Sequence, residues 1–347
     1  MRYDEPDRES RTVEDRRGRG GGGGLFRFPG GVGPRSGGGG RRVEIPFPMG
    51  RRGGRGGFSI TTLIIIGVIM WFLGINPFSI LTGGGGGGTA GLPDFDNMPQ
   101  MPKFDRPDNR QARQGDDGFR LPGDSGAQNR APLPDDELAT FTKRVLADTE
   151  DVWNRVFQQF GRDYREPKMV IYSGATRTAC GLGQAAMGPF YCPLDEKIYL
   201  DLGFYRELQA KFRAPGDFAQ DSVVAHEVGH HVQKLLGIAD RVMELKQRHP
   251  RAANQIQVRM ELQADCLSGV WANLNHQLNN RLEPGDIREG LNAASEIGDD
   301  MIQRRQQGYV VPDAFTHGSS EQRVRWFQKG YQAGNMKVCD TFNARDL

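Results

Sequence analysis

The longest run of apolar residues lies in the first quarter of the chain. Residues 58–81 contain no charged side chain, and ITTLIIIGVIMWFLGI at 60–75 is almost uniformly apolar. About 20 such residues cross the roughly 30 Å of hydrocarbon in a bilayer. We therefore expect a single membrane-spanning helix at 58–81. A buried core helix and a cleaved signal peptide are the alternatives, but the leader of 57 residues is too long for a signal peptide.

From Asp135 onwards, apolar positions alternate with polar ones at the spacing of helices and short strands. Leu138, Phe141 and Val145 begin a helical pattern that continues to Phe160, and strands are expected at 169–172 and 198–202. Further helices are predicted at about 203–212, 217–236, 252–277, 285–307 and 319–333. The predicted fold is mainly α with a small β-sheet (α+β), in one domain over residues 135–347.

Composition separates this domain from the residues before it. Of 48 glycines, 27 fall within residues 1–91, and residues 1–57 hold 13 Arg against 7 Asp or Glu. We expect a disordered Arg/Gly-rich tail at 1–57 and a Gly/Pro-rich mobile linker at 82–134. The tail resembles Arg/Gly segments that bind RNA. A solvated basic tail on anionic lipid is the preferred interpretation, so nucleic acid is not an expected partner.

Charge around the apolar run predicts its orientation. Arg51, Arg52 and Arg55 precede it, and the next positive side chain is Lys103. Because positive residues stay on the cytoplasmic side, we expect a cytoplasmic amino terminus and a single pass through the inner membrane. The domain at 135–347 would then lie in the periplasm or an equivalent extracytoplasmic space.

The chain has four cysteines, an even number that suits an oxidising compartment. Three pairings are possible from sequence. We prefer the disulfides Cys180–Cys192 and Cys266–Cys339, and four free buried thiols are the alternative.

The sequence HEVGH at 226–230 contains the HExxH pattern. His226 and His230 are four positions apart on a predicted helix, so both imidazoles can bind one zinc ion. Glu227 lies beside that pair, where a general base would reach the water on the same ion. The alternative is two core histidines beside a surface carboxylate.

A catalytic zinc ion needs a third protein ligand. The metzincin pattern is excluded, because positions 233 and 236 are Gln and Leu. Downstream, ELQAD places Glu261 and Asp265 on one face of another predicted helix. Glu261 is the expected third ligand, and Asp265 would accept the outer N–H of a ligand imidazole. His249 and His276 remain rival third ligands.

Small residues Ala264 and Gly269 on the second helix would let it pack closely against the HExxH helix. The chain resembles the bacterial neutral zinc metallopeptidase family. The motifs that carry this resemblance are HEVGHHVQ and ELQADCLSG, together with SGATRTACG, GPFYCP, KIYLD and THGSSEQRVRW. Members of this family are single-pass membrane proteins related to the gluzincin endopeptidases, with a zincin-like domain. The resemblance covers about 135–340 and the anchor, and it implies zinc ligands at His226, His230 and Glu261, a general base at Glu227 and a supporting role for Asp265.

Two further segments have weaker interpretations. Residues 179–187 (ACGLGQAAM) are small enough for a substrate backbone to approach as an added strand, although a stapled surface loop explains them equally well. By resemblance, His317 would hydrogen-bond the developing oxyanion. A helix start capped by Ser319 or Ser320 also explains that stretch, and Arg323 is undecided. His231 is expected to pack rather than bind metal.

These observations predict a membrane-anchored zinc endopeptidase that hydrolyses peptide bonds through a zinc-bound water, with Glu227 as general base and a protein or peptide as substrate. The alternative is a non-catalytic, zinc-stabilised module of the same fold that binds peptides or acts as a scaffold.

Overall fold

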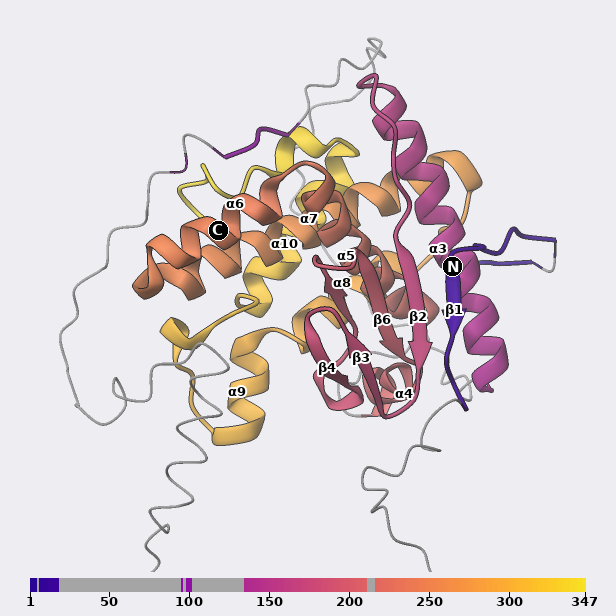
Figure 1. Ribbon diagram of the computed structural model, residues 1–347, viewed down its shortest axis with the longest axis horizontal. Helices are drawn as coiled ribbons and strands as arrows, with labels where there is room; N and C mark the ends of the chain where they lie inside the picture. Colours follow the sequence, from indigo (N-terminus) through magenta and orange to yellow (C-terminus); the bar gives the residue numbers. More distant parts are fainter. Residues whose placement is uncertain (5, 19–94, 96–97, 102–133, 211–215) are drawn as a thin grey trace, which may run out of the picture. The chain divides into compact units, whose positions relative to one another are not determined.

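The computed structural model describes residues 1–4, 6–18, 95, 98–101, 134–210 and 216–347 (Figure 1). The membrane-spanning helix predicted at 58–81 lies outside these residues. Within the described part of the chain, no helix combines the length and the apolar character needed to cross a bilayer.

Helices make up most of the described structure, as the apolar spacing predicts. They are α3 (Asp135–Gln158), α4 (Gly203–Ala210), α5 (Asp217–Leu235), α6 (Ile238–Arg248), α7 (Ala253–Asn279), α8 (Asp286–Glu296), α9 (Asp299–Gln307) and α10 (Ser320–Ala333). Short 3-10 turns lie at η1 (Ala185–Met187), η2 (Pro250–Ala252), η3 (Pro312–Ala314) and η4 (Met336–Cys339). Helix α7 packs between α5 and α10. Trp153, Trp271 and Trp326, from α3, α7 and α10, are fully buried in the core around it.

A small sheet lies beside these helices, in the strand order β1-β2-β6-β5. Strands β1 (Val13–Asp15), β2 (Lys168–Tyr172) and β6 (Lys197–Asp201) are parallel, whereas β5 (Phe190–Cys192) pairs antiparallel with β6. A separate hairpin joins β3 (Ala175–Thr178) to β4 (Gly181–Gln184). The α+β prediction is confirmed, and β2 and β6 lie within one residue of the predicted strands.

The prediction of a disordered tail over residues 1–57 is wrong for residues 1–4 and 6–18. Strand β1 continues the sheet by pairing with β2, with Val13 opposite Met169. Arg8 binds Glu150 of α3 at 2.7 Å, and the side chain of Met1 is buried. The prediction failed because glycine and arginine content was averaged over the whole segment. The residues before Gly18 are mostly polar, and they show no apolar periodicity from which their contacts could be predicted.

The prediction of a mobile linker over 82–134 is likewise wrong for residues 95 and 98–101. Phe95, Met98 and Met101 are buried against the domain. The ring of Phe95 lies edge-on to Phe342, with centroids 5.5 Å apart, and the Arg259 guanidinium lies 5.3 Å from its centroid. Three apolar side chains spaced by three residues can dock without any regular secondary structure.

The helix predictions are also wrong in two places. The helix expected at 285–307 is broken into α8 and α9 at Gly298, where a side chain would meet Ser320. Helix α6 has no counterpart in the predicted set, although Ile238, Val242 and Leu245 are buried at helical spacing.

Both preferred disulfides are present. Cys180–Cys192 joins the β3–β4 hairpin to β5, and Cys266–Cys339 joins α7 to η4.

Candidate metal centre and cleft

Close packing of α5 against α7 brings the HExxH and ELQAD motifs together. A Cβ atom on Gly229 would lie 3.1 Å from the Ala264 carbonyl oxygen, so glycine allows an approach that any other residue would make too tight by tenths of an ångström. The sequence correctly singled out Ala264. Gly269 instead faces α10, since a side chain there would collide with the backbone of Phe327.

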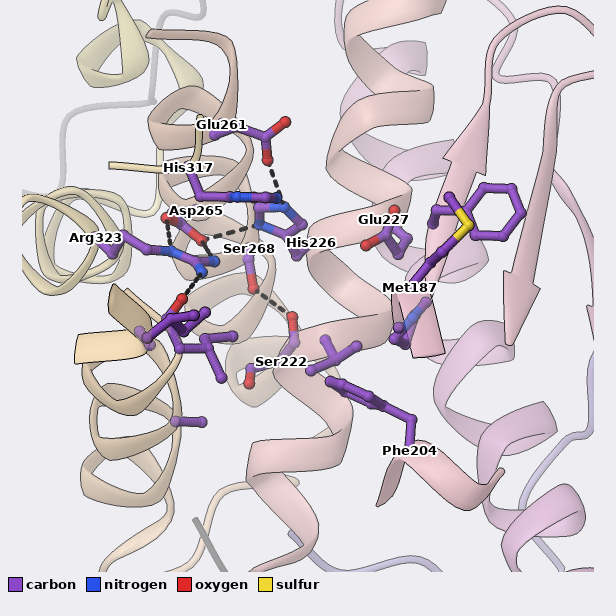
Figure 2. Close-up of a pocket in the computed structure, with 18 of the residues that line it drawn as sticks. Met187, Phe204, Ser222, His226, Glu227, Glu261, Asp265, Ser268, His317 and Arg323 are labelled. Atoms are coloured by element: carbon purple, nitrogen blue, oxygen red, sulfur yellow. Dashed lines mark hydrogen bonds and ion pairs between the residues drawn. The ribbon is translucent and has the colours of Figure 1, made fainter. Parts of the chain in front are cut away.

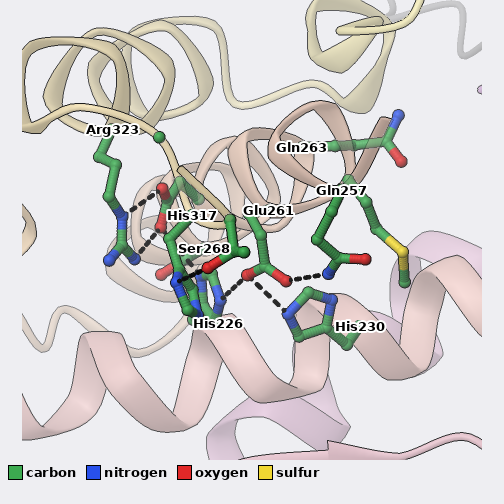
Figure 3. Close-up of polar contacts among 12 residues, drawn as sticks. His226, His230, Gln257, Glu261, Gln263, Ser268, His317 and Arg323 are labelled. Atoms are coloured by element: carbon green, nitrogen blue, oxygen red, sulfur yellow. Dashed lines mark hydrogen bonds and ion pairs between the residues drawn. The ribbon is translucent and has the colours of Figure 1, made fainter. Parts of the chain in front are cut away.

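Three potential ligands converge between the two helices (Figure 3). The Nε2 atom of His226 lies 3.2 Å from Glu261 Oε2, and the Nε2 atom of His230 lies 3.3 Å from the same oxygen. All three donor atoms are within 4.8 Å of one another. Two imidazoles and one carboxylate are a donor set that binds zinc in proteins. The predicted ligand residues are therefore together in space.

Hydrogen bonds on the outer side of each imidazole determine which nitrogen faces the centre. His226 donates from Nδ1 to Asp265 Oδ1 at 2.9 Å. His230 donates from Nδ1 to Gln233 Oε1 at 2.8 Å, because the Gln233 amide already donates to the Met260 carbonyl. In its neutral form, each ring thus turns an Nε2 lone pair toward Glu261 Oε2. Converging electron pairs repel unless a proton or a metal ion lies between them, so the deprotonated residues fit a divalent metal ion.

Glu261 is oriented in the same way. Gln257, one turn earlier on α7, donates from Nε2 to Glu261 Oε1 at 2.6 Å and leaves Oε2 for the centre. Burial alone would lower the pKa of His226, but the charges of Asp265 and Glu261 outweigh it and raise this pKa to about 10. The charge of Glu261 and its contact with His230 likewise outweigh burial and raise the pKa of His230. Both pKa shifts show that the nearby carboxylates stabilise a positive charge between them.

Arg323 of α10 completes the support for His226. It is buried and forms a two-pronged ion pair with Asp265, from Nε to Oδ2 at 2.9 Å and from Nη2 to Oδ1 at 2.8 Å. Although burial raises the pKa of Asp265, Arg323 and His226 together lower it to about 2. The carboxylate therefore stays ionised as an acceptor for His226. The sequence gave Arg323 no definite role.

The centre opens into a pocket of about 590 Å³. Glu227 lies on the opposite side of the centre from Asp265 and Arg323, toward Met187 (Figure 2). His317 also lines the pocket. The apolar wall is formed by side chains from α4, α5, α8 and α10 and from the residue that follows α8, which are Phe204, Val223, Ala293, Ala294, Ile297 and Phe327.

His317 occupies a loop that is held by Asp299. The backbone N–H groups of Thr316 and His317 each donate to Asp299 Oδ2 at 2.6 Å, and the His317 ring lies 3.4 Å from Oδ1. The helix-start interpretation also holds, since Ser319 caps α10 in a reciprocal capping box with Gln322. The loop thus does both: it begins a helix and brings a half-exposed imidazole to the pocket.

The remaining histidines lie elsewhere. His231 packs as expected, with Nδ1 3.0 Å from the Tyr191 hydroxyl and Nε2 2.5 Å from the Arg165 carbonyl oxygen. His249 is exposed at the end of α6, and His276 accepts the Leu282 N–H near the end of α7. Neither rival belongs to the three-residue cluster with His226 and His230.

Only part of the segment at 179–187, which was expected to receive substrate, lies at the pocket. Within 179–187, Ala186 and Met187 line the pocket, whereas the missing side chain of Gly183 makes room for the Phe190 ring. Strand β5 ends the sheet beside α5, and its residues Phe190 and Tyr191 line the pocket. The sequence missed this strand because three residues are too few for an alternation pattern.

Comparison with known proteins assigns the family. The model of the family described as "Putative neutral zinc metallopeptidase" matches residues 110–342, and the chain belongs to this family. It is 54% identical over 209 residues to Uncharacterized protein YpfJ of Escherichia coli K12, covering 60% of this chain and 72% of that protein. It is 42% identical over 214 residues to Uncharacterized protein Mb2605 of Mycobacterium bovis, covering 59% and 71% respectively. No solved structure matches the chain.

Family and site agree at a coarse level. The family is one of zinc metallopeptidases, and the described residues include a buried cluster of two histidines and one glutamate in a pocket. The chain is thereby assigned to the zinc-dependent peptidases.

Proposed function

We propose that this protein is a membrane-anchored zinc endopeptidase of the gluzincin type with a zincin-like domain. The observation that carries the proposal is the convergence of two Nε2 lone pairs and Glu261 Oε2 at the floor of an open pocket that also contains Glu227. A merely structural zinc site is closed by four protein ligands, whereas this set supplies three.

Each residue of the pocket has a task in the proposed hydrolysis. Bound zinc would acidify a water molecule and polarise the scissile carbonyl. Glu227 accepts a proton from the attacking water and delivers it to the leaving amine. His317, held by Asp299, donates a hydrogen bond to the oxyanion that develops on the carbonyl oxygen.

The substrate is a polypeptide bound in extended form. Strand β5 offers its backbone at the edge of the sheet next to α5, where an added strand would bring a peptide bond to the centre. The apolar wall of the pocket, with the exposed side chain of Met187 at its rim, favours a substrate with an apolar residue beside the cleaved bond.

A non-catalytic module that uses zinc only for stability is the competing function. Such a module needs His226, His230 and Glu261 but has no use for a carboxylate beside them. The position of Glu227 in the pocket favours the enzyme.

The peptidase domain is proposed to lie outside the cytoplasm. Two disulfides, Cys180–Cys192 and Cys266–Cys339, support this location because cytosolic thiols are kept reduced. Attachment through an apolar helix at 58–81 remains a prediction from the sequence.

Glu227→Gln tests the catalytic proposal. General-base catalysis contributes roughly 10²- to 10⁴-fold in rate, so we expect the full-length variant to cleave an unfolded protein at least about 100-fold more slowly. Zinc content should stay equal to that of the unaltered protein, since all three ligands remain.

The matched control is Glu321→Gln, which changes the same side chain at an exposed position of α10. It should leave both cleavage and zinc content unchanged. Cleavage by Glu227→Gln at the unaltered rate would refute the general-base role, and a preparation without stoichiometric zinc would refute the metal centre.

A further inference from the structure

A row of buried amide groups leads from His230 away from the pocket. Gln233 of α5 is 0% exposed, and Gln263 of α7 (Figure 3) is 2% exposed. Gln233 accepts the His230 N–H at Oε1 and donates from Nε2 to Gln263 Oε1 at 3.0 Å. Gln263 in turn donates from Nε2 to the carbonyl oxygen of Cys339 at 2.9 Å. This amide row therefore connects a predicted zinc ligand to η4, which lies 76 positions after Gln263.

The Cys339 carbonyl determines the direction of every hydrogen bond in the amide row. A backbone carbonyl group only accepts, so Gln263 must turn its NH2 group toward Cys339 and its oxygen toward Gln233. That oxygen requires an N–H of Gln233, whose own oxygen then faces His230. His230 must consequently donate from Nδ1, which leaves its Nε2 atom for the metal centre.

Gln263 adds to the support that Gln233 receives from the Met260 carbonyl. Met260 accepts one hydrogen of the Gln233 amide, and Gln263 accepts the other. A reversed Gln233 amide would direct its oxygen at two acceptors and its NH2 group at the N–H of His230. Buried polar groups without a partner cost free energy, so the two acceptors together strongly disfavour the reversed orientation.

The Cys266–Cys339 disulfide holds the Cys339 carbonyl beside Gln263. Cys266 follows Gln263 by three positions on α7, so the two side chains are neighbours on the helix surface. The disulfide brings the Cα atoms of Cys266 and Cys339 within 5.6 Å of each other, and both residues are fully buried. The acceptor at the end of the amide row is thus attached covalently to the helix that carries Gln263 and Glu261.

We propose that Gln263 and the Cys266–Cys339 disulfide position the zinc ligand His230 through Gln233. Gln263 is a positioning residue, because it acts on His230 only through the Gln233 amide. The metal centre then reaches its full affinity in the disulfide-bonded form, where every acceptor of the amide row is held in place. This proposal rests on the metal centre of the proposed function and not on peptide hydrolysis.

Gln263→Met tests the role of the amide row in the full-length protein. Methionine keeps the length of the side chain and removes both of its hydrogen-bonding groups. Loss of a direct outer contact of a ligand histidine costs about 10- to 100-fold in metal affinity, and we expect about 3- to 10-fold here because Met260 still holds Gln233. Competition with a chelator measures zinc affinity. With Co²⁺ bound instead of zinc, the visible absorption bands should shift, since they report the geometry of the ligands.

The matched control is Asn275→Leu, which removes another buried amide from α7. Asn275 donates to Asp148 of α3 and does not belong to the amide row. It should lower the Tm of the metal-free protein but leave zinc affinity and the Co²⁺ spectrum unaltered. Unchanged zinc affinity in Gln263→Met, or an equal loss of affinity in Asn275→Leu, would overturn the proposal.

Removal of the disulfide tests the other end of the amide row. In the variant with Cys266→Ala and Cys339→Ala, Arg259 still binds the carbonyl oxygens of Phe342 and Ala344, so the segment after η4 keeps an attachment to α7. We expect a loss of zinc affinity similar to that of Gln263→Met. Removal of the other disulfide, by Cys180→Ala and Cys192→Ala, is the control and should leave zinc affinity unchanged.

The combined variant shows whether the disulfide acts through Gln263. If it does, Gln263→Met together with Cys266→Ala and Cys339→Ala should bind zinc as weakly as Gln263→Met alone. Additive losses would mean that the disulfide acts by another route and would contradict the proposal. If the zinc affinities follow the expected pattern but no form of the protein cleaves peptides, the peptidase function fails and the positioning of His230 stands.

Discussion

Each ligand of the metal centre is oriented by a second residue. Asp265 holds His226, Gln233 holds His230, and Gln257 holds Glu261. These contacts turn two imidazole Nε2 atoms and one carboxylate oxygen toward a common point before any metal binds. Such pre-arranged donors lower the reorganisation that metal binding would otherwise require.

The Arg323–Asp265 ion pair yields a prediction for metal affinity. In Arg323→Lys the positive charge is kept, but the two-pronged contact with Asp265 is lost. We expect zinc affinity to fall about 10- to 100-fold, the usual cost of losing an outer contact of a ligand histidine. Competition with a chelator of known zinc affinity measures the change.

Arg325→Lys is the control for this prediction, because Arg325 lies two residues further on α10 and pairs with exposed Glu321. It should keep the affinity of the unaltered protein. Equal affinities in the two variants would show that Arg323 has no role in positioning His226.

At this scale the sequence predicts the ligands and the support from Asp265, but it misses the supports from Gln233, Gln257 and Arg323. HExxH and ELQAD place their residues by helical periodicity, which is local and can be seen without a structure. Arg323 meets Asp265 across 58 positions of the chain. Such a contact depends on how α10 packs on α7, and no spacing within either segment encodes it.

The approach of α5 to α7 decides whether the ligands meet. Gly229→Ala would place a methyl group 3.1 Å from the Ala264 carbonyl oxygen and 3.3 Å from its Cα, both backbone atoms that cannot rotate away. Helix propensity favours alanine by about 1 kcal/mol, whereas overpacking costs about 1 to 3 kcal/mol. We expect stability to change little and zinc affinity to fall several-fold, because the helices separate by tenths of an ångström.

Zinc titration together with thermal unfolding of the metal-free variant separates these two effects. Unchanged zinc affinity in Gly229→Ala would contradict the view that this contact sets the distance between the ligands. A large loss of stability without metal would mean instead that the helix pair itself is disrupted.

Element boundaries illustrate the limits of periodicity. The main helices and two strands follow from apolar spacing, and the HExxH helix ends within one residue of its prediction. The division of residues 285–307 depends on the contact of Gly298 with Ser320, which belongs to another helix. The docking of Phe95 against Phe342 likewise depends on a partner far away in the sequence. Strand β5 pairs with the nearby β6, and its three residues are too few for an alternation pattern.

For the whole molecule, the contacts of the two docked segments with the domain bear on how the chain is placed across a membrane. Their amino-acid composition did not predict these contacts. Residues 6–18 and 98–101 both pack against the domain at 134–347, although they lie on either side of the predicted membrane span in the sequence. The disulfides favour an oxidising compartment for the domain. The sequence prediction of a single crossing at 58–81 would instead put the amino terminus on the opposite side of the membrane. One crossing and a docked amino terminus exclude each other, because no segment can pack across a bilayer.

The docked segment leads us to expect residues 1–18 in the same compartment as the peptidase domain. The test introduces one cysteine at exposed Arg11 in one variant and at exposed Met243 of α6 in another, each in the full-length protein. A membrane-impermeant maleimide applied to intact spheroplasts should then label both variants to the same extent, before and after lysis. Labelling of the Met243 variant alone would place the amino-terminal segment in the cytoplasm, restore the single crossing predicted from charge, and rule out the pairing of β1 with β2 in the cell.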